Sequence, residues 1–330
     1  MVKFEGKCGV SATVVCDSIS EAGIRLLTFE LTYWRGVLSE ANTHRMLSKN
    51  SASSRAIPFA KMKENLTGRP VRFGAANPGM QDKGEDFNGT VMGWPQEHEG
   101  NCGAPAWSAE EAWNEAREHA VFFSEAFYKA GYAKQVYNRL TEPFQMMKTV
   151  LSGTELENFF WLRDDGAADP SLAELARCMR EAKDTSTPKL LKAGEYHLPY
   201  VEYEVDPVKG MIYYITDNEG FVEVLTVENA VKVSCARAAA VSFRNTDYGL
   251  DKCLEVYERL VGDERKHASA LEHQATPMAA AKTTYQSLLD GSCWKQGVSH
   301  MDSKGFLWSG NFRGFVQHRK LVDGENKSGY

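Results

Sequence analysis

The sequence predicts an α+β fold in which an antiparallel sheet is combined with helices. Residues 11–16 (SATVVC) and 26–33 (LLTFELTY) are rich in Val, Thr, Phe and Tyr, which is typical of strands. Residues 108–131 have the apolar spacing of a long helix. After Pro188, further β-like runs are separated by turn sequences, which favours antiparallel pairing.

In the first half of the chain, residues 40–58 are expected to follow a strand directly, and residues 70–105 to form a long loop or lid rich in Gly, Asn, Pro and Asp. The helix at 108–131 opens with a Ser108–Glu111 capping box and ends at Gly131. Two more helices are expected at 153–163 and 169–183, the second with Asp169 as N-cap and Pro170 in its first turn. The face expected to pack on the long helix consists of Ala112, Ala116, Ala120, Phe123 and Phe127.

In the second half, β-like runs cover residues 198–205, 211–216 and 221–227, and DPVKG and DNEG between them indicate hairpin turns. A helix follows near residues 247–262, because Leu250, Leu254, Tyr257 and Val261 form one apolar stripe. A basic, aromatic tail, GNFRGFVQHRK, lies near the C-terminus.

The composition restricts the class of protein. The 330 residues include 38 basic and 44 acidic side chains, and no Lys/Arg run offers a surface for a nucleic-acid duplex. The seven cysteines are scattered and form no C-x-x-C pair, which argues against a disulfide framework or a zinc site. No run of eighteen apolar residues occurs, and the N-terminus is unlike a signal peptide. We expect a cytoplasmic protein, in the host cytoplasm if it is viral, with no metal and no nucleic-acid or membrane partner.

Residues 40–58, EANTHRMLSKNSASSRAIP, concentrate a His, two Arg, an Asn and five hydroxyl side chains. Related groups recur at Arg139, at Asn158 with Arg163, and in KHASALEHQA. Arginine forks and hydroxyls bind phosphates and the carbonyl edge of a pyrimidine, so a planar phosphorylated ligand is indicated. The same groups are also common in solvated loops and helix ends. Dinucleotide, P-loop, zincin and serine-hydrolase motifs are absent from the sequence.

The segment THRMLSKNSASSR resembles the signature of the flavin-dependent thymidylate synthases, R-H-R-x-x-S-x-N-x-x-S-x-R. Every fixed position agrees except the first, where Thr43 replaces Arg. NRLTEPF resembles the family's Arg-x-x-x-Pro segment, and LENFFWLR resembles its Asn-Phe-x-x-x-Arg helix. CARAAAVSF is similar to A-R-V-S-[FY], and KHASALEHQA is similar to H-x-[ST]-P-x-E-H with Ala270 at the Pro position.

The last two segments normally precede the R-H-R signature, so the resemblance implies a circularly permuted, phage-type member of the family. Permutation is tolerated where termini lie at the surface. On this interpretation residues 1–187 are the N-terminal part of the catalytic domain, with the loop at 70–105. Residues 188–229 are a small β-rich insertion, and residues 230–330 complete the catalytic domain.

The resemblance also implies an activity: reductive methylation of dUMP to dTMP with FAD, methylenetetrahydrofolate and NADPH. The residues implied at FAD are His44, Arg45, Asn158, Ser242, His267 and Ser269. The residues implied at the pyrimidine deoxynucleotide are Glu40, Ser53, Ser54, Arg55, Arg139 and Arg163. Arg163 is the expected catalytic residue, because a guanidinium at the pyrimidine carbonyl would stabilise developing negative charge.

The family's active sites lie between subunits, so a homotetramer is expected. Two alternatives stay open. The enzyme could methylate or hydroxymethylate another pyrimidine nucleotide such as dCMP, because Glu40 stands where many members have Gln and a carboxylate only accepts hydrogen bonds. The chain could also be a nucleotide- or flavin-binding protein without turnover.

Overall fold

A six-stranded sheet forms the centre of the N-terminal half in the computed structural model, which describes residues 2–55, 57–77, 84–93, 106–216, 220–241 and 248–325. Its main strands run in the order β1-β2-β3-β7-β4, each antiparallel to its neighbour, and the short β8 is parallel to β2. Their bounds are β1 (Val2–Glu5), β2 (Ser11–Ser20), β3 (Arg25–Trp34), β4 (Ser48–Ser51), β7 (Met146–Gly153) and β8 (Lys189–Leu191). The predicted mixture of helices and antiparallel sheet is confirmed.

Four strands of this sheet, β1, β4, β7 and β8, were not predicted, and two of them lie at the candidate site. Strand β7, MMKTVLSG, is buried at nearly every position, so it shows no polar–apolar alternation. Strand β4 lies inside the polar stretch at 40–58, and its SKNS sequence has little strand propensity. It forms because β7 provides a complete hydrogen-bonding partner along its length.

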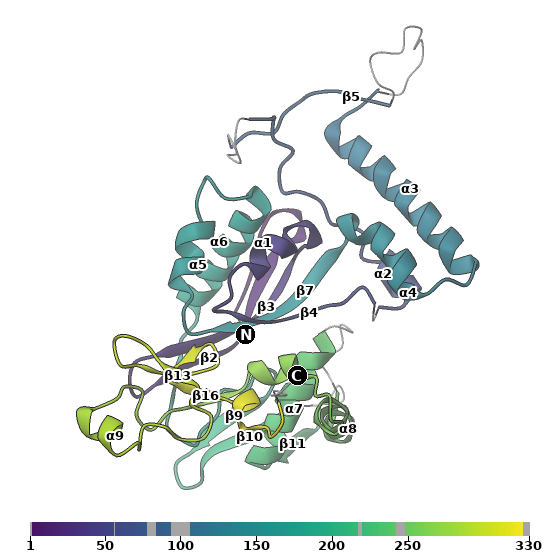
Figure 1. The fold of residues 1–330 in the computed structure, drawn as a ribbon. Helices are drawn as coiled ribbons and strands as arrows, with labels where there is room; N and C mark the ends of the chain where they lie inside the picture. The colour runs from purple at the N-terminus through teal and green to yellow at the C-terminus, as the bar shows by residue number, and fades with distance from the viewer. Residues whose placement is uncertain are drawn as a thin grey trace.

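Helices α5 (Glu157–Arg163) and α6 (Pro170–Thr185) lie beside the sheet (Figure 1). Leu172, Leu175 and Met179 of α6 are fully buried in the same cluster as the strand residues. The predicted start of the first of these helices was wrong, because Gly153 is the last residue of β7. Between β3 and β4 the chain forms η2 (Arg35–Val37) and α1 (Leu38–Asn42).

The long helix α3 (Ala109–Lys129) has the predicted capping box and projects from the sheet (Figure 1). Its packing face agrees with the prediction only in part: Ala120 packs on a small core as predicted, but Phe123 is 55% exposed, and Trp113 and Val121, which were not predicted, pack there too. That core involves α2 (Phe59–Lys63), α4 (Lys134–Tyr137) and η3 (Asn138–Phe144). The described part of the 70–105 loop contains β5 (Val91–Met92), which pairs with β6 (Ala106–Trp107).

The C-terminal half has its own core. Strands β9 (Glu202–Asp206), β10 (Gly210–Thr216) and β11 (Val222–Leu225) form the expected antiparallel sheet. It packs on α7 (Val227–Ala240) and α8 (Leu250–Val261) through Tyr213, Leu225 and Val231. Most of the DNEG turn, at 217–219, lies outside the described residues. The status of this sheet as an insertion stays a prediction.

The remaining C-terminal elements are short. They are η5 (Ala268–Glu272), β12 (Ala275–Pro277), α9 (Tyr285–Leu289), β13 (His300–Met301), β14 (Leu307–Ser309), β15 (Phe312–Arg313), β16 (Phe315–Gln317) and η6 (His318–Leu321); a further turn, η1 (Lys7–Gly9), lies near the N-terminus. Strand β16 pairs with β12. Phe312 and Phe315 are fully buried in a cluster with Ile24 and Leu26, which attaches the tail to the N-terminal half. No helix in the described ranges is long and apolar enough to cross a membrane.

Candidate functional site

The first group of predicted site residues lines a cavity of about 370 Å³, called here the His44 cavity. One wall is the loop after α1 and the other is the region of α5. Arg163 Nε donates a hydrogen bond to His44 Nε2 (2.8 Å), and Arg163 Nη2 donates to Thr43 Oγ1 (3.3 Å). The lining residues are Thr43, His44, Arg45, Met46, Leu47, Glu155, Asn158, Phe159, Leu162 and Arg163.

His44 is held as a neutral imidazole. Its Nε2 accepts from Arg163, so its ring proton is on Nδ1. Burial lowers the pKa of His44, and the positive charges of Arg163 and Lys49 lower it further. The ring also meets Phe159 edge-on, with 4.9 Å between ring centroids. These contacts fix both the imidazole and the guanidinium that donates to it.

Lys49 closes the loop that carries His44. Its Nζ donates to the carbonyl oxygens of His44 (2.6 Å) and Leu47 (3.3 Å). Burial lowers the pKa of Lys49 to about 8, and the Glu272 carboxylate opposes this shift. Sequence reasoning missed Lys49, because it occupies an unspecified position of the signature.

The second group of predicted residues lines a separate cavity of about 720 Å³, called here the Asn50 cavity. Asn50 at the end of β4 donates from Nδ2 to the Ala238 carbonyl of α7 (2.7 Å), and Ser269 Oγ of η5 lies 3.5 Å from Asn50 Oδ1. Residues far apart in the chain therefore meet here. The lining residues are Asn50, Ser53, Arg55, Ala133, Lys134, Gln135, Ala239, Leu260, His267, Ser269 and Ala270.

A neighbouring cavity of about 560 Å³ extends this site along α8. It shares Ala239, Leu260 and His267 with the Asn50 cavity and adds the basic side chains of Lys252 and Arg259. Lys134, in the Asn50 cavity itself, was also not predicted, because nothing around it in the sequence distinguishes it from an ordinary surface lysine.

The other predicted site residues lie elsewhere. Ser54 is buried and donates to Glu142 Oε1 (2.5 Å), and Glu142 also pairs with Arg35 (3.0 Å). Arg139 and Glu40 are exposed and outside the linings of the His44 and Asn50 cavities. The Glu40 carboxylate accepts from Ser39 Oγ (2.7 Å). Ser242 lies outside the described residues. The roles of all these residues stay predictions.

The donor set suits an anionic ligand with a flat ring. In the Asn50 cavity, Arg55, Lys134 and His267 can face phosphates, while Ala239 and Leu260 offer apolar contact. Both cavity volumes fall in the usual range for small-molecule sites, about 300–1,000 Å³. Within the described ranges, no three His, Cys, Asp or Glu side chains are grouped to hold a metal ion. The chemistry of the lining residues is therefore compatible with a flavin and a nucleotide phosphate.

Burial argues against two of the cysteines as nucleophiles. It raises the pKa of the Cys16 thiol to about 12 and that of Cys178 to about 11, so both stay protonated near neutral pH.

The solved structures similar to this chain include two of flavin-dependent thymidylate synthase from Helicobacter pylori, both with FAD and dUMP. They are 16% and 17% identical to this chain, each covering 48% of it and 67% of its own chain, with a TM-score of 0.32. No family model and no curated protein matches the sequence. The likeness covers only part of the chain, and the site described above rests on the contacts of this chain's own residues.

Proposed function

We propose that the protein is a flavin-dependent thymidylate synthase, which methylates dUMP to dTMP using FAD, methylenetetrahydrofolate and NADPH. The observation that supports this most is the arrangement around β4. The signature residues on either side of this strand meet Arg163 at the His44 cavity, and His267 with Ser269 at the Asn50 cavity. These segments are more than a hundred residues apart in the sequence, yet they are the ones that the signature resemblance links.

FAD would supply hydride chemistry when bound. His44, Arg45 and Asn158 would hold it from the His44 cavity, and His267 with Ser269 would hold it from the Asn50 cavity. Arg163 would donate to the pyrimidine carbonyl and stabilise negative charge there. Because His44 accepts from Arg163 Nε and Thr43 accepts from Nη2, the guanidinium keeps one orientation, in which Nη1 would donate to the ligand. Arg55 and Ser53 would bind the nucleotide phosphate, with Lys134 nearby.

We also propose a homotetramer with active sites between subunits. The His44 set and the His267 set line separate cavities on one chain. A flavin that contacts both sets would therefore bridge the His44 cavity of one subunit and the Asn50 cavity of another. Light scattering with size-exclusion chromatography measures the assembly. A monomer with full activity at nanomolar concentration would contradict the proposal.

Glu40 supports dUMP over dCMP as the substrate. A carboxylate that selects cytosine would have to face the base, whereas Glu40 is exposed and accepts from Ser39. Tritium release from carbon 5 of dUMP and of dCMP tests this choice. We expect release from dUMP in both wild type and Glu40→Gln. A preference for dCMP that Glu40→Gln reverses would assign base selection to Glu40.

Flavin content tests the proposed function directly. The purified protein should show a flavin absorption band near ~450 nm that bleaches on addition of NADPH, because the cofactor carries the redox chemistry. His44→Ala and Asn158→Ala should release flavin. Arg55→Ala and Arg163→Ala should keep flavin and lose nucleotide affinity. A wild-type protein that binds neither FAD nor dUMP would refute the proposed function.

A further inference from the structure

The C-terminal strap, defined as residues 307–325, lies outside the segments that carry the family resemblance. Its apolar anchor consists of Phe312 and Phe315, both fully buried. Polar side chains within and beside this anchor reach the elements that line the two cavities. Arg313 forms an ion pair with Glu155 (2.9 Å), which lines the His44 cavity, and its backbone N–H donates to Thr154 Oγ1 (3.0 Å).

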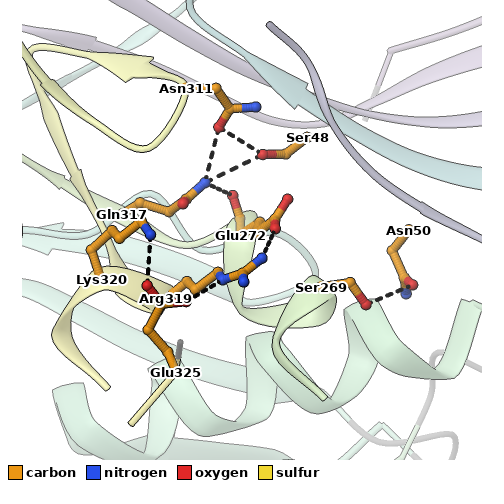
Figure 2. A network of polar contacts seen from close by, with 9 residues as sticks. All are labelled: Ser48, Asn50, Ser269, Glu272, Asn311, Gln317, Arg319, Lys320 and Glu325. Atoms are coloured by element: carbon orange, nitrogen blue, oxygen red, sulfur yellow. Dashed lines mark hydrogen bonds and ion pairs between the residues drawn. The ribbon is translucent and has the colours of Figure 1, made fainter. Parts of the chain in front are cut away.

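The second set of contacts lies between β4 and η5 (Figure 2). Gln317 Nε2 donates to Ser48 Oγ on β4 (3.3 Å) and to the Glu272 carbonyl on η5 (2.9 Å). Asn311 Oδ1 accepts from both Gln317 (3.2 Å) and Ser48 (3.0 Å). Gln317 is 2% exposed, so these hydrogen bonds are shielded from water. One buried amide thus joins the signature strand to η5.

Arg319 adds a charged link to the same helix. Its Nη1 donates to the Glu272 carboxylate, and its Nε donates to Glu325 (2.7 Å), as Figure 2 shows. Lys320 also pairs with Glu325 (2.6 Å), but within the described residues it makes no ion pair with Glu272. Arg319 and both carboxylates are partly buried, so solvent screens these pairs less than surface pairs.

Apart from the strap, η5 is tied to the N-terminal sheet by the hydrogen bond between Ser152 Oγ and His273 Nδ1 (2.8 Å), and β4 is tied to α7 by the one between Asn50 and Ala238 (2.7 Å), but β4 and η5 make little direct polar contact with each other. Strand β4 is the edge of its sheet, and η5 is a five-residue 3-10 helix, a type of structure with poor hydrogen-bond geometry. Their direct polar contact, between Ser269 Oγ and Asn50 Oδ1, is long at 3.5 Å. The spacing between Asn50 and Ser269 therefore depends on groups outside both elements.

We propose that the C-terminal strap positions the candidate site, with Gln317 and Arg319 as positioning residues that hold η5 against β4. Arg319 acts through Glu272, and Gln317 acts through Ser48 and the Glu272 carbonyl. The strap thereby sets the wall of the Asn50 cavity that carries Ser269. The identity of the ligand in this inference, FAD, rests on the proposed function; the positioning of η5 does not.

The experiment compares Arg319→Met with Lys320→Met. Both remove a cation that pairs with Glu325, but only Arg319 also reaches Glu272. Amide hydrogen exchange is measured in residues 48–51 and 268–274, and FAD affinity is measured by flavin fluorescence. Arg319→Met should speed exchange in both segments and weaken FAD binding by about tenfold or more, as expected for a lost charged hydrogen bond. Lys320→Met should change FAD affinity by less than about twofold.

Two further variants separate positioning from general destabilisation. Arg319→Lys keeps a cation for Glu272 and should restore most of the FAD affinity at an unchanged unfolding midpoint. Arg319→Met combined with Glu272→Gln should bind FAD no more weakly than the weaker single variant, because both changes break one link. Additive losses would overturn the route through Glu272. If Arg319→Met does not fold, Glu272→Gln and Glu325→Gln provide the same comparison.

The outcomes for the two proposals are distinct. Equal exchange rates in Arg319→Met and Lys320→Met would overturn the positioning role, whatever the protein binds. A wild type that binds no flavin would overturn the proposed function, and hydrogen exchange would still decide the role of the strap.

Discussion

Thr43 replaces the first arginine of the signature, and the contacts of Arg163 show what the replacement does. Thr43 Oγ1 accepts from Arg163 Nη2, as His44 Nε2 accepts from Arg163 Nε. An arginine at position 43 has no acceptor and would add a second cation there. In this chain, Arg163 is therefore oriented by two neutral acceptors, and it lines the His44 cavity together with Arg45.

We predict that Arg163→Ala weakens dUMP binding by about 1.5 to 3 kcal/mol, because a charged hydrogen bond to the base is lost. Isothermal titration calorimetry measures the affinity. Arg180→Ala is the control, since Arg180 lies on α6, pairs with Asp164 and is outside the His44 cavity. Equal dUMP affinities in the two variants would show that Arg163 does not bind the nucleotide.

Arg55→Ala should have a similar effect through the phosphate. Arg55 is exposed on the rim of the Asn50 cavity, so we expect dUMP affinity to fall by about 1.5 to 3 kcal/mol with no loss of stability. Deoxyuridine, which lacks the phosphate, should bind both proteins equally. Lys61→Ala, an exposed cation on α2, is the control. A matching loss for deoxyuridine would show that Arg55 does not act on the phosphate.

At the element scale, α6 supports the site by packing against α5, which carries Arg163. Asp169 caps α6 by accepting from the N–H groups of Ser171 (2.8 Å) and Leu172 (3.2 Å). Asp169→Ala should lower the free energy of unfolding by about 1 kcal/mol, within the usual range for a lost N-cap. Urea unfolding measures this. Asp169→Asn should be nearly neutral, as should Asp184→Ala near the other end of the helix. A neutral Asp169→Ala would mean that the cap contributes nothing.

The elements whose signals lie within a few residues could be predicted from the sequence. Elements that form only through contacts with distant strands could not. The Ser108–Glu111 box and the Asp169 cap were found because capping depends on residues within one turn. Strand β7 was missed, since burial on both faces removes the alternation that marks a strand. At the site, the signature located both cavities. It could not show that they are separate, or that Lys49 and the strap brace them, because those contacts depend on tertiary structure.

At the scale of the whole molecule, a buried polar chain connects the N-terminal sheet to the C-terminal half. It runs from Ser18 through His197 (2.9 Å) to Thr28 (2.8 Å), then to Ser152 (2.6 Å) and His273 (2.8 Å). Within the described residues, His273 Nε2 has no hydrogen-bond partner. Burial lowers the pKa of both histidines to about 3, so both are neutral in the folded protein near neutral pH.

The two buried histidines predict that the folded state loses stability in acid. In the unfolded state each histidine takes up a proton near pH 6.5, whereas in the folded state it does so only near pH 3. The contribution of the two neutral histidines to the free energy of unfolding is therefore complete above pH 6.5 and is lost as the pH falls. Each contributes a slope of up to about 1.4 kcal/mol per pH unit. Urea unfolding from pH 7 to 5 should show this decline before most carboxylates titrate. His273→Gln should flatten it, whereas exposed His300→Gln should not. A flat wild-type profile would contradict the prediction.

The last prediction tests the circular permutation that the family resemblance implies. The segments that resemble the family's first motifs lie beside the signature strand: Ala238 accepts from Asn50, and η5 packs against β4. Joining the termini with a flexible linker and opening the chain before Thr226 would restore the family's order and keep Thr226 as the N-cap of α7. Opening before Val231 would instead cut α7 in its second turn. We expect the first permutant to fold and bind FAD as the parent does, measured by circular dichroism and flavin fluorescence, and the second to be less stable. A folded first permutant that has lost FAD, beside a parent that binds it, would count against the permuted order as the origin of this site.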